Sequence, residues 1–80
     1  MYVYLIRSIN SPNQIYIGRT QDFSTRLKSH NQGSSKHSSK YRPWELEVLV
    51  YFKNHELGIK FEKYLKSGSG RAFSKRRFGV

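Results

Sequence analysis

Residues 15–31 read IYIGRTQDFSTRLKSHN, in which a strand pattern passes directly into a helix pattern. Ile15 and Ile17 point to one face of the strand and Tyr16 and Gly18 to the other, because strand side chains alternate. Gly18 has no side chain, so the backbone there can bend or admit a close neighbour. We therefore expect the end of this strand to be accessible to a ligand.

A short helix is predicted directly after this strand. Asp22 or Ser24 supplies an N-cap oxygen, which satisfies a free backbone N–H in the first turn. Phe23, Leu27 and His30 then recur at helical spacing and form the inward face.

This strand-turn-helix unit brings polar side chains toward one end. Tyr16, Arg19, Arg26 and His30 belong to it, and little acidic charge lies nearby in the sequence. Such a group suits a phosphodiester better than a protein core.

The N-terminal segment predicts a central strand. Residues 2–7 alternate so that both faces carry apolar side chains, and a strand buried on both faces lies inside a sheet. Residues 10–13 are typical of a turn, so this strand and the one at Ile15 form a hairpin. Tyr4 and Tyr16 then share a face if the register is favourable.

The middle of the chain predicts a loop and a third strand. Residues 32–40 are polar, basic and rich in serine, which favours a loop. Residues 45–52 alternate as a strand, with Leu46, Val48 and Val50 on one face.

A second helix should begin after Asn54, which is a good N-cap. Its apolar stripe is Leu57, Phe61, Tyr64 and Leu65. Glu62 borders this stripe without belonging to the core. Residues 67–70 should end the helix, and residues 71–78 should form a last short helix.

Composition narrows the class of protein. Eighty residues are expected to form one domain over residues 1–80. Fifteen Lys and Arg residues against five Asp and Glu residues give a net charge of +10, so the expected partner is a polyanion. No basic amphipathic helix favours a membrane, so nucleic acid is preferred. Without cysteine, a leader or a long apolar run, we expect a soluble, cytoplasmic protein.

One set of residues resembles a known family. Tyr4, the segment Tyr16–Gly18, Arg26, His30 and Glu62 are similar to the GIY-YIG nuclease pattern, and the resemblance covers nearly the whole chain. The first half of the motif lacks its glycine, whereas the second half is intact. The chain is most similar to the small stand-alone YhbQ-type members and to the nuclease module at the start of the excision-repair protein UvrC.

The resemblance implies an α+β fold, with a three-stranded antiparallel sheet flanked by helices, and a metal-dependent phosphodiesterase. Tyr4 and Tyr16 match the two motif tyrosines, either of which can serve as the base. Arg26 matches the helix arginine, and His30 matches a histidine that donates or relays protons. Glu62 matches the single metal-binding carboxylate.

The chemistry agrees with these assignments. A tyrosine loses its proton near pH 10, so a catalytic phenolate needs help from cations such as Arg19, Arg26 and a bound metal. Arg26 can also fork onto two phosphate oxygens. Glu62 is a hard oxygen ligand that suits Mg²⁺ or Mn²⁺. Only five acidic residues are present, so a site with one metal ion is easier to build than a site with two.

Other basic residues should hold the DNA backbone without reading bases. They are Arg19, Lys28, Lys36, His37, Lys40, Arg71, Lys75 and Arg76. Arg19 stands where some family members carry a lysine, and His37 matches a further histidine of some members. The simpler alternatives are a solvated basic face, two core tyrosines, and an ordinary ion pair between Glu62 and Lys66.

We therefore predict a Mg²⁺- or Mn²⁺-dependent endonuclease that acts on DNA with weak sequence specificity, in structure-directed or repair-related cutting. RNA as a substrate and a targeting protein partner are left open. The alternative is a catalytically inactive, basic nucleic-acid-binding module with the same fold.

Overall fold

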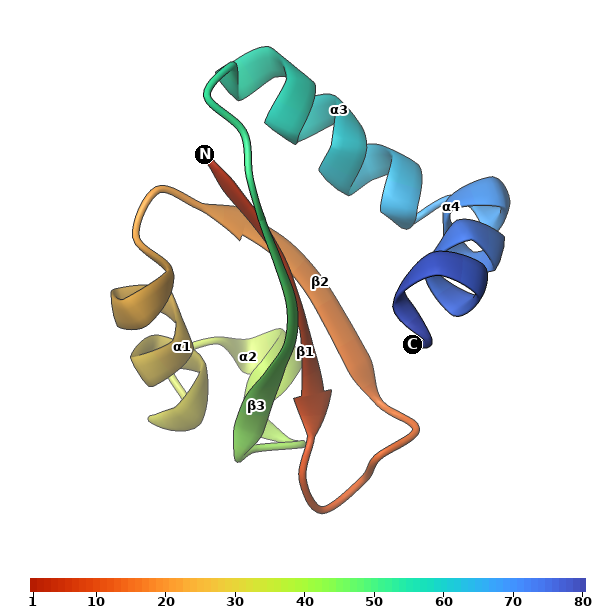
Figure 1. The fold of residues 1–80 in the computed structure, drawn as a ribbon. Coiled ribbons are helices and arrows are strands. Elements are labelled where there is room, and N and C mark those ends of the chain that lie inside the picture. The colour runs from red at the N-terminus through yellow and green to blue at the C-terminus, as the bar shows by residue number, and fades with distance from the viewer.

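The computed structural model describes all 80 residues as a three-stranded antiparallel sheet with helices on both of its faces (Figure 1). The elements in chain order are β1 (Tyr2–Ser8), β2 (Ile15–Thr20), α1 (Phe23–Asn31), α2 (Lys36–Ser39), β3 (Trp44–Tyr51), α3 (His55–Leu65), α4 (Gly68–Phe73) and the π-helix η1 (Ser74–Phe78). The expected α+β class is confirmed. None of the helices has the length and apolar character that crossing a membrane requires.

Strand β1 lies at the centre of the sheet, as predicted, because the strand order is β2-β1-β3. It pairs antiparallel with both neighbours. Val3, Tyr4, Leu5 and Ile6 are each 1% exposed or less, so both faces of this strand are covered. One strand therefore contributes side chains to two separate cores.

The first core lies between the sheet and the C-terminal helices. Val3 and Leu5 pack against Leu65 of α3, with partly buried side chains of α4 and η1 around them. On this face α3 packs against β1 and β2 through apolar side chains.

The second core lies between the sheet and helices α1 and α2. Tyr4 and Ile6 pack there against Trp44, with Tyr16 at the margin. Asn31 holds Trp44 in place, because its Oδ1 accepts from the Trp44 N–H at 2.6 Å and its Nδ2 donates to the Trp44 carbonyl at 3.2 Å. The end of α1 is thus fixed to the start of β3.

The predicted loop over residues 32–40 contains a short helix, α2, so this prediction is wrong in part. The Nε1–H of Trp44 donates to the carbonyl of Ser38 at 2.9 Å, and Ser38 is fully buried. A tertiary contact therefore orders a segment whose composition is typical of a loop.

Strand β3 contains an irregularity that the alternation does not reveal. Leu5 pairs with Val48 and Ile6 pairs with Leu46, so Glu47 is the extra residue of a β-bulge. The bulge turns Leu46 to the face opposite Val48, and the prediction that these two residues share a face is wrong.

Helix α3 has its buried side rotated from the predicted stripe. Leu57 is 52% exposed and Tyr64 is 40% exposed, whereas Gly58 and Glu62 are buried. A Cβ on Gly58 would lie 2.7 Å from the Met1 side chain, so the glycine lets the helix come close to the N-terminus. Glu62, one turn later, is thereby brought inside rather than left at the border.

The C-terminal helix starts earlier than predicted, at Gly68 rather than at residue 71. Ser67 caps it, because its Oγ accepts from the N–H of Gly70 at 3.1 Å. Gly70 packs against the end of α3, where a Cβ would lie 1.8 Å from the carbonyl oxygen of Tyr64. The glycine is required by this contact and does not mark a helix end.

Gly70→Ala should destabilise the fold, whereas Gly68→Ala should not. The new methyl at Gly70 meets backbone atoms, and overpacking of this kind costs about 1–3 kcal/mol. Nothing lies within 4 Å of the Cβ position at Gly68, so alanine there should be neutral or stabilise by about 0.5 kcal/mol. Urea unfolding measures both values, and equal effects of the two substitutions would contradict the packing described.

Candidate active site

A buried chain of hydrogen bonds links the sheet to α1 and α2. The Tyr4 hydroxyl lies 2.9 Å from Nε2 of His30, and Nδ1 of the same ring lies 2.6 Å from Oγ of Ser38. All three residues are 1% exposed or less. The ring of Tyr16 packs edge-on against His30, with 4.7 Å between the centroids. The second core therefore contains a fully partnered polar chain rather than apolar contacts alone.

The local sequence explains why His30 reaches this position. Asp22 is the N-cap of α1, since its Oδ1 accepts from the Thr25 N–H at 3.2 Å. Hydrogen bonds from the side chain and the backbone of Thr25 lower the pKa of the Asp22 carboxyl. Two turns later His30 lies in the last turn of the helix and faces the sheet. Of the two predicted caps, Asp22 is the one used.

Ser38 was not singled out from the sequence. It belongs to a stretch with four nearby serines at positions 34, 35, 38 and 39, and nothing in the local pattern distinguishes one from another. Only the packing of α2 against Trp44 and His30 selects it.

Gly18 lets the Tyr4 hydroxyl lie directly over the backbone of β2. Tyr4 and Gly18 are register partners in the β1–β2 ladder. A Cβ on Gly18 would lie 2.4 Å from the Tyr4 oxygen, so no other residue fits without displacement of the phenol. The bare glycine predicted from the sequence thus serves a close approach by a tyrosine.

A buried carboxylate forms the other part of the site. Oε1 of Glu62 lies 2.9 Å from a guanidinium nitrogen of Arg19, and Oε2 lies 2.5 Å from the Lys66 ammonium. The Glu62 side chain is 6% exposed, whereas those of Arg19 and Lys66 are 40% and 54% exposed. The predicted pair with Lys66 is present, and Arg19, which is 43 residues away in the sequence, is a second partner.

The two parts come from opposite faces of the sheet. Arg19 pairs with Val3 in the ladder and faces α3 with Glu62, whereas Tyr4 and Tyr16 face α1. Strand β2 is an edge strand of the sheet, and α1 and α3 cover opposite faces of that sheet (Figure 1). We call the group of Tyr4, Tyr16, His30 and Ser38 and the group of Arg19, Glu62 and Lys66 the two half-sites. The residues that match the family pattern therefore do not share one face of the sheet, because the structure divides them between the two faces at the edge of β2.

Electrostatics connects the two half-sites. Burial raises the pKa of the Tyr4 phenol, the neighbouring Tyr16 raises it further, Arg26 lowers it, and Glu62 raises it. The charges on Arg26 and Glu62 therefore both act on the Tyr4 hydroxyl. We expected cations near a motif tyrosine to lower its pKa. Without a bound metal ion the pKa of Tyr4 is instead raised, because the effect of burial is larger than the opposing effect of Arg26.

Burial also keeps His30 neutral. It lowers the pKa of the imidazole, and the positive charge of Arg26 lowers it further. At neutral pH both Tyr4 and His30 are therefore uncharged, and the ring nitrogen of His30 that carries no hydrogen can accept a proton.

The predicted DNA-binding residues fall into two groups, all exposed. On the side of α1 and α2 lie Lys28, Lys36, His37 and Lys40, and on the side of α4 and η1 lie Arg71, Lys75 and Arg76. Arg19 of β2 stands apart from both groups, because it is paired with Glu62. No ion pair involves any residue of these two groups. The structure does not bring His37 to the Tyr4–His30–Ser38 chain.

Glu62 fits a hard divalent cation as a single protein ligand. It is the one buried carboxylate of the chain, and no cluster of three His, Asp or Glu side chains is present. Mg²⁺ commonly keeps several waters and binds one or two carboxylates plus substrate phosphate. The exposed ammonium of Lys66 can move away from Oε2, which then becomes available as a ligand.

Comparison with known proteins agrees with this geometry. The sequence model of the family described as GIY-YIG catalytic domain matches residues 1–77. The structure-specific endonuclease subunit SLX1 of Debaryomyces hansenii is 39% identical over 72 residues, which cover 80% of this chain and 20% of that protein. The SLX1 subunit of Malassezia globosa is 42% identical over 64 residues, which cover 74% of this chain and 14% of that protein.

The SLX1 subunit of Candida dubliniensis is 38% identical over 72 residues, which cover 80% of this chain and 25% of that protein. The chain thus spans between 14% and 25% of the length of these three relatives. No solved structure matches it. The family match over residues 1–77, together with the two motif tyrosines on adjacent strands, confirms the resemblance: the chain belongs to the GIY-YIG family as a GIY-YIG catalytic domain.

Proposed function

We propose that this domain is an endonuclease that hydrolyses DNA phosphodiester bonds at the free edge of β2. The observation that carries the proposal is the arrangement around Gly18, where a buried Tyr4–His30–Ser38 chain lies on one side and the buried carboxylate of Glu62, paired with the exposed Arg19, lies on the other. The net charge of +10 supports a nucleic-acid substrate. Since the relatives are named structure-specific endonuclease subunits, we infer a DNA structure rather than a sequence as the target.

Tyr4 is the proposed base, because it alone of the two motif tyrosines has a hydrogen-bonded route for its proton. A phenol with a raised pKa does not hold a negative charge at rest, so it must lose its own proton as it accepts one from water. Nε2 of neutral His30, at 2.9 Å, can take that proton. Nδ1–H then donates to Ser38, which fixes the tautomer and the ring orientation.

Arg26 and Arg19 are the proposed phosphate clamps. Arg26 is exposed, unpaired and close enough to act on Tyr4, and its planar guanidinium can donate two parallel hydrogen bonds to phosphate oxygens. Arg19 already holds one oxygen of Glu62 and is partly exposed, so it can position the carboxylate and meet a phosphate as well. Charge that grows on the phosphoryl oxygens would be stabilised by both groups.

Glu62 is the proposed metal ligand. GIY-YIG nucleases generally use a divalent metal ion, and the lone hard oxygen ligand favours Mg²⁺ or Mn²⁺ here. Such an ion would neutralise phosphate charge and lower the pKa of a bound water. The relatives are also named as subunits, so we propose that a protein partner contributes to targeting.

Loss of the proposed site residues should abolish cutting of a flapped DNA in the presence of Mg²⁺. Glu62→Gln and Arg26→Ala should each lower the cleavage rate by about 10²–10⁴-fold, since each removes charge stabilisation of the transition state. The matched control is Glu56→Gln, an exposed carboxylate in the first turn of the same helix. Gel assays of cleavage measure the rates. Activity that survives in both site variants would place the chemistry elsewhere.

The two tyrosines should respond differently. Tyr4→Phe removes the hydroxyl that is bonded to His30 and should lower kcat by about 10²-fold or more with little change in KM. Tyr16→Phe keeps this chain intact and should have the smaller effect on kcat. The reverse order would assign the base to Tyr16.

The fold should lose stability as pH falls below 6.5 because of His30. Burial lowers its pKa in the folded state, so the unfolded chain binds more protons in this range and stability decreases with acid. The slope is at most about 1.4 kcal/mol per pH unit for one group. Urea unfolding at several pH values should show this slope in the parent and in His37→Gln, an exposed histidine. A slope that persists in His30→Gln would refute the neutral, buried imidazole.

A further inference from the structure

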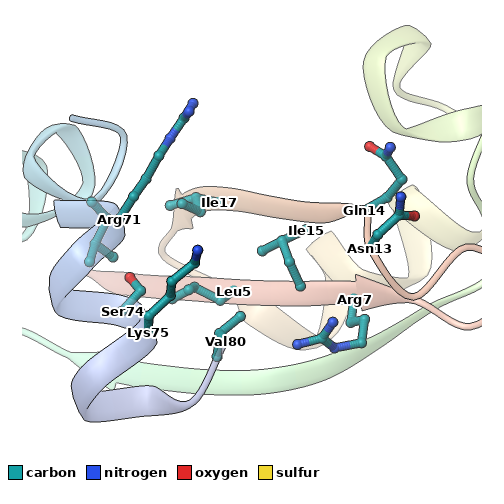
Figure 2. Close-up of a pocket in the computed structure, with 11 residues that line it drawn as sticks. Leu5, Arg7, Asn13, Gln14, Ile15, Ile17, Arg71, Ser74, Lys75 and Val80 are labelled. Carbon is teal, nitrogen blue, oxygen red and sulfur yellow. The ribbon is translucent and has the colours of Figure 1, made fainter. Parts of the chain in front are cut away.

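A pocket of about 540 Å³ opens between the β1–β2 hairpin and the C-terminal helices (Figure 2). Its apolar lining includes Leu5, Ile15, Ile17 and Leu65. The volume lies within the range of about 300–1,000 Å³ that small organic ligands occupy in proteins. The pocket is separate from the Tyr4–His30–Ser38 chain, which faces the other side of the sheet.

The rim of this pocket is positively charged. Arg7, Arg71 and Lys75 line it, and no acidic residue does. Arg7 is already engaged, because it pairs with Glu47 and donates to the Pro12 carbonyl. The other two cations have no acidic partner.

Arg71 and Lys75 are four residues apart on one continuous helical segment, and both extend beside the pocket in Figure 2. Like charges at this spacing repel one another. A bound anion would relieve this repulsion, so the rim suits a phosphate group.

Neutral hydrogen-bonding groups face this pair across the pocket. Figure 2 shows Asn13 and Gln14 at the hairpin end, with the isoleucines of β2 between them and Arg71. The pocket thus combines an apolar surface, amide groups and two free cations. A nucleotide has the matching parts, namely a flat base with polar edges and a phosphate.

The pocket lies on the same face as the Glu62 half-site. Ile15, Ile17 and Arg19 alternate along β2 and therefore point to one side of the sheet. The rise of a strand places Ile17 about 7 Å from Arg19, which is the length of two stacked nucleotide steps. A nucleic-acid strand held at Arg19 thus reaches the pocket within a few nucleotides.

We propose that this pocket holds an unpaired nucleotide of the DNA substrate, with its base on the apolar lining and a neighbouring phosphate on Arg71 and Lys75. Bases in a duplex are stacked and paired, so they cannot enter a pocket, whereas an unpaired base can be splayed out into one. The inference deepens the proposed function and rests on it, because it assigns the single-stranded arm of a branched or flapped DNA to the α3 side of the cleavage site.

The test compares binding of two DNAs in the absence of metal. One is a blunt duplex, and the other is the same duplex with a single-stranded arm of six thymidines. Arg71→Gln/Lys75→Gln should weaken binding of the armed DNA about tenfold more than binding of the duplex. Lys60→Gln/Lys63→Gln removes the same charge from exposed positions of α3 outside the pocket, and it should weaken both DNAs by equal factors. Fluorescence anisotropy at fixed salt gives the four ratios.

A DNA whose single-stranded arm lacks bases separates the contribution of the base to binding from the contribution of the phosphate charge. Replacement of the first three thymidines by abasic sites should lower the affinity of the parent protein, and should lower that of Arg71→Gln/Lys75→Gln by a smaller factor, because the phosphate beside the base is no longer held. Equal weakening of both DNAs by the two double variants, or no effect of abasic sites, would overturn the proposal. Displacement of the armed DNA by polyglutamate as readily as by free oligothymidine would also overturn it, since the rim would then recognise charge alone.

The two proposals can fail separately. A protein that binds the armed DNA through this pocket but never cuts it contradicts the nuclease function alone. A protein that cuts armed DNA at a rate independent of Arg71 and Lys75, and binds it no better than duplex, contradicts the pocket alone.

Discussion

The structure depends on a single strand that is buried on both faces. β1 contributes Val3 and Leu5 to one core and Tyr4 and Ile6 to the other, and all four are essentially inaccessible to solvent. In so short a chain, one strand must serve both cores because there is too little sequence to build each separately. The helices on both faces of the sheet therefore pack against side chains of the same strand. The two half-sites are positioned relative to one another through it.

The buried polar side chains of the two cores all have hydrogen-bond or ion-pair partners. Both ring nitrogens of His30 have partners, both oxygens of Glu62 have cations, and no buried side-chain nitrogen or oxygen lacks a hydrogen bond. A buried polar chain is costly unless every member is satisfied, and once satisfied it is rigid. The domain therefore holds its proposed reactive groups in place before any substrate binds. The partners that remain exposed, Arg19 and Lys66, are the ones free to release the carboxylate and bind a phosphate.

The edge of β2 is where these features meet. Its outward side pairs with no other strand, and the Tyr4 hydroxyl covers its backbone at Gly18. On the opposite face, Arg19 lies beside Glu62, and Ile17 and Ile15 line the pocket that Arg71 and Lys75 border. A free sheet edge is usually a liability that proteins cover or charge. Here Arg19 of β2, Arg71 of α4 and Lys75 of η1 supply positive charge, which makes this edge attractive to a polyanion.

Local periodicity was sufficient to predict the three strands, the helix after the second strand, the helix capped by Asn54 and the central place of β1, because alternation and helical spacing are local properties. It left the cap of the first helix open between Asp22 and Ser24. The motif residues Tyr4, Tyr16, Arg26, His30 and Glu62 were likewise found from spacing and resemblance. Tertiary structure alone decided the bulge at Glu47, the ordering of α2 by Trp44, the selection of Ser38, and the rotation of α3 that buries Glu62 beside Arg19. The bulge and the Arg19–Glu62 pair depend on contacts between residues about 40 or more positions apart, and the selection of Ser38 depends on how α2 packs against His30 and Trp44. Neither strand alternation nor helical spacing encodes such contacts.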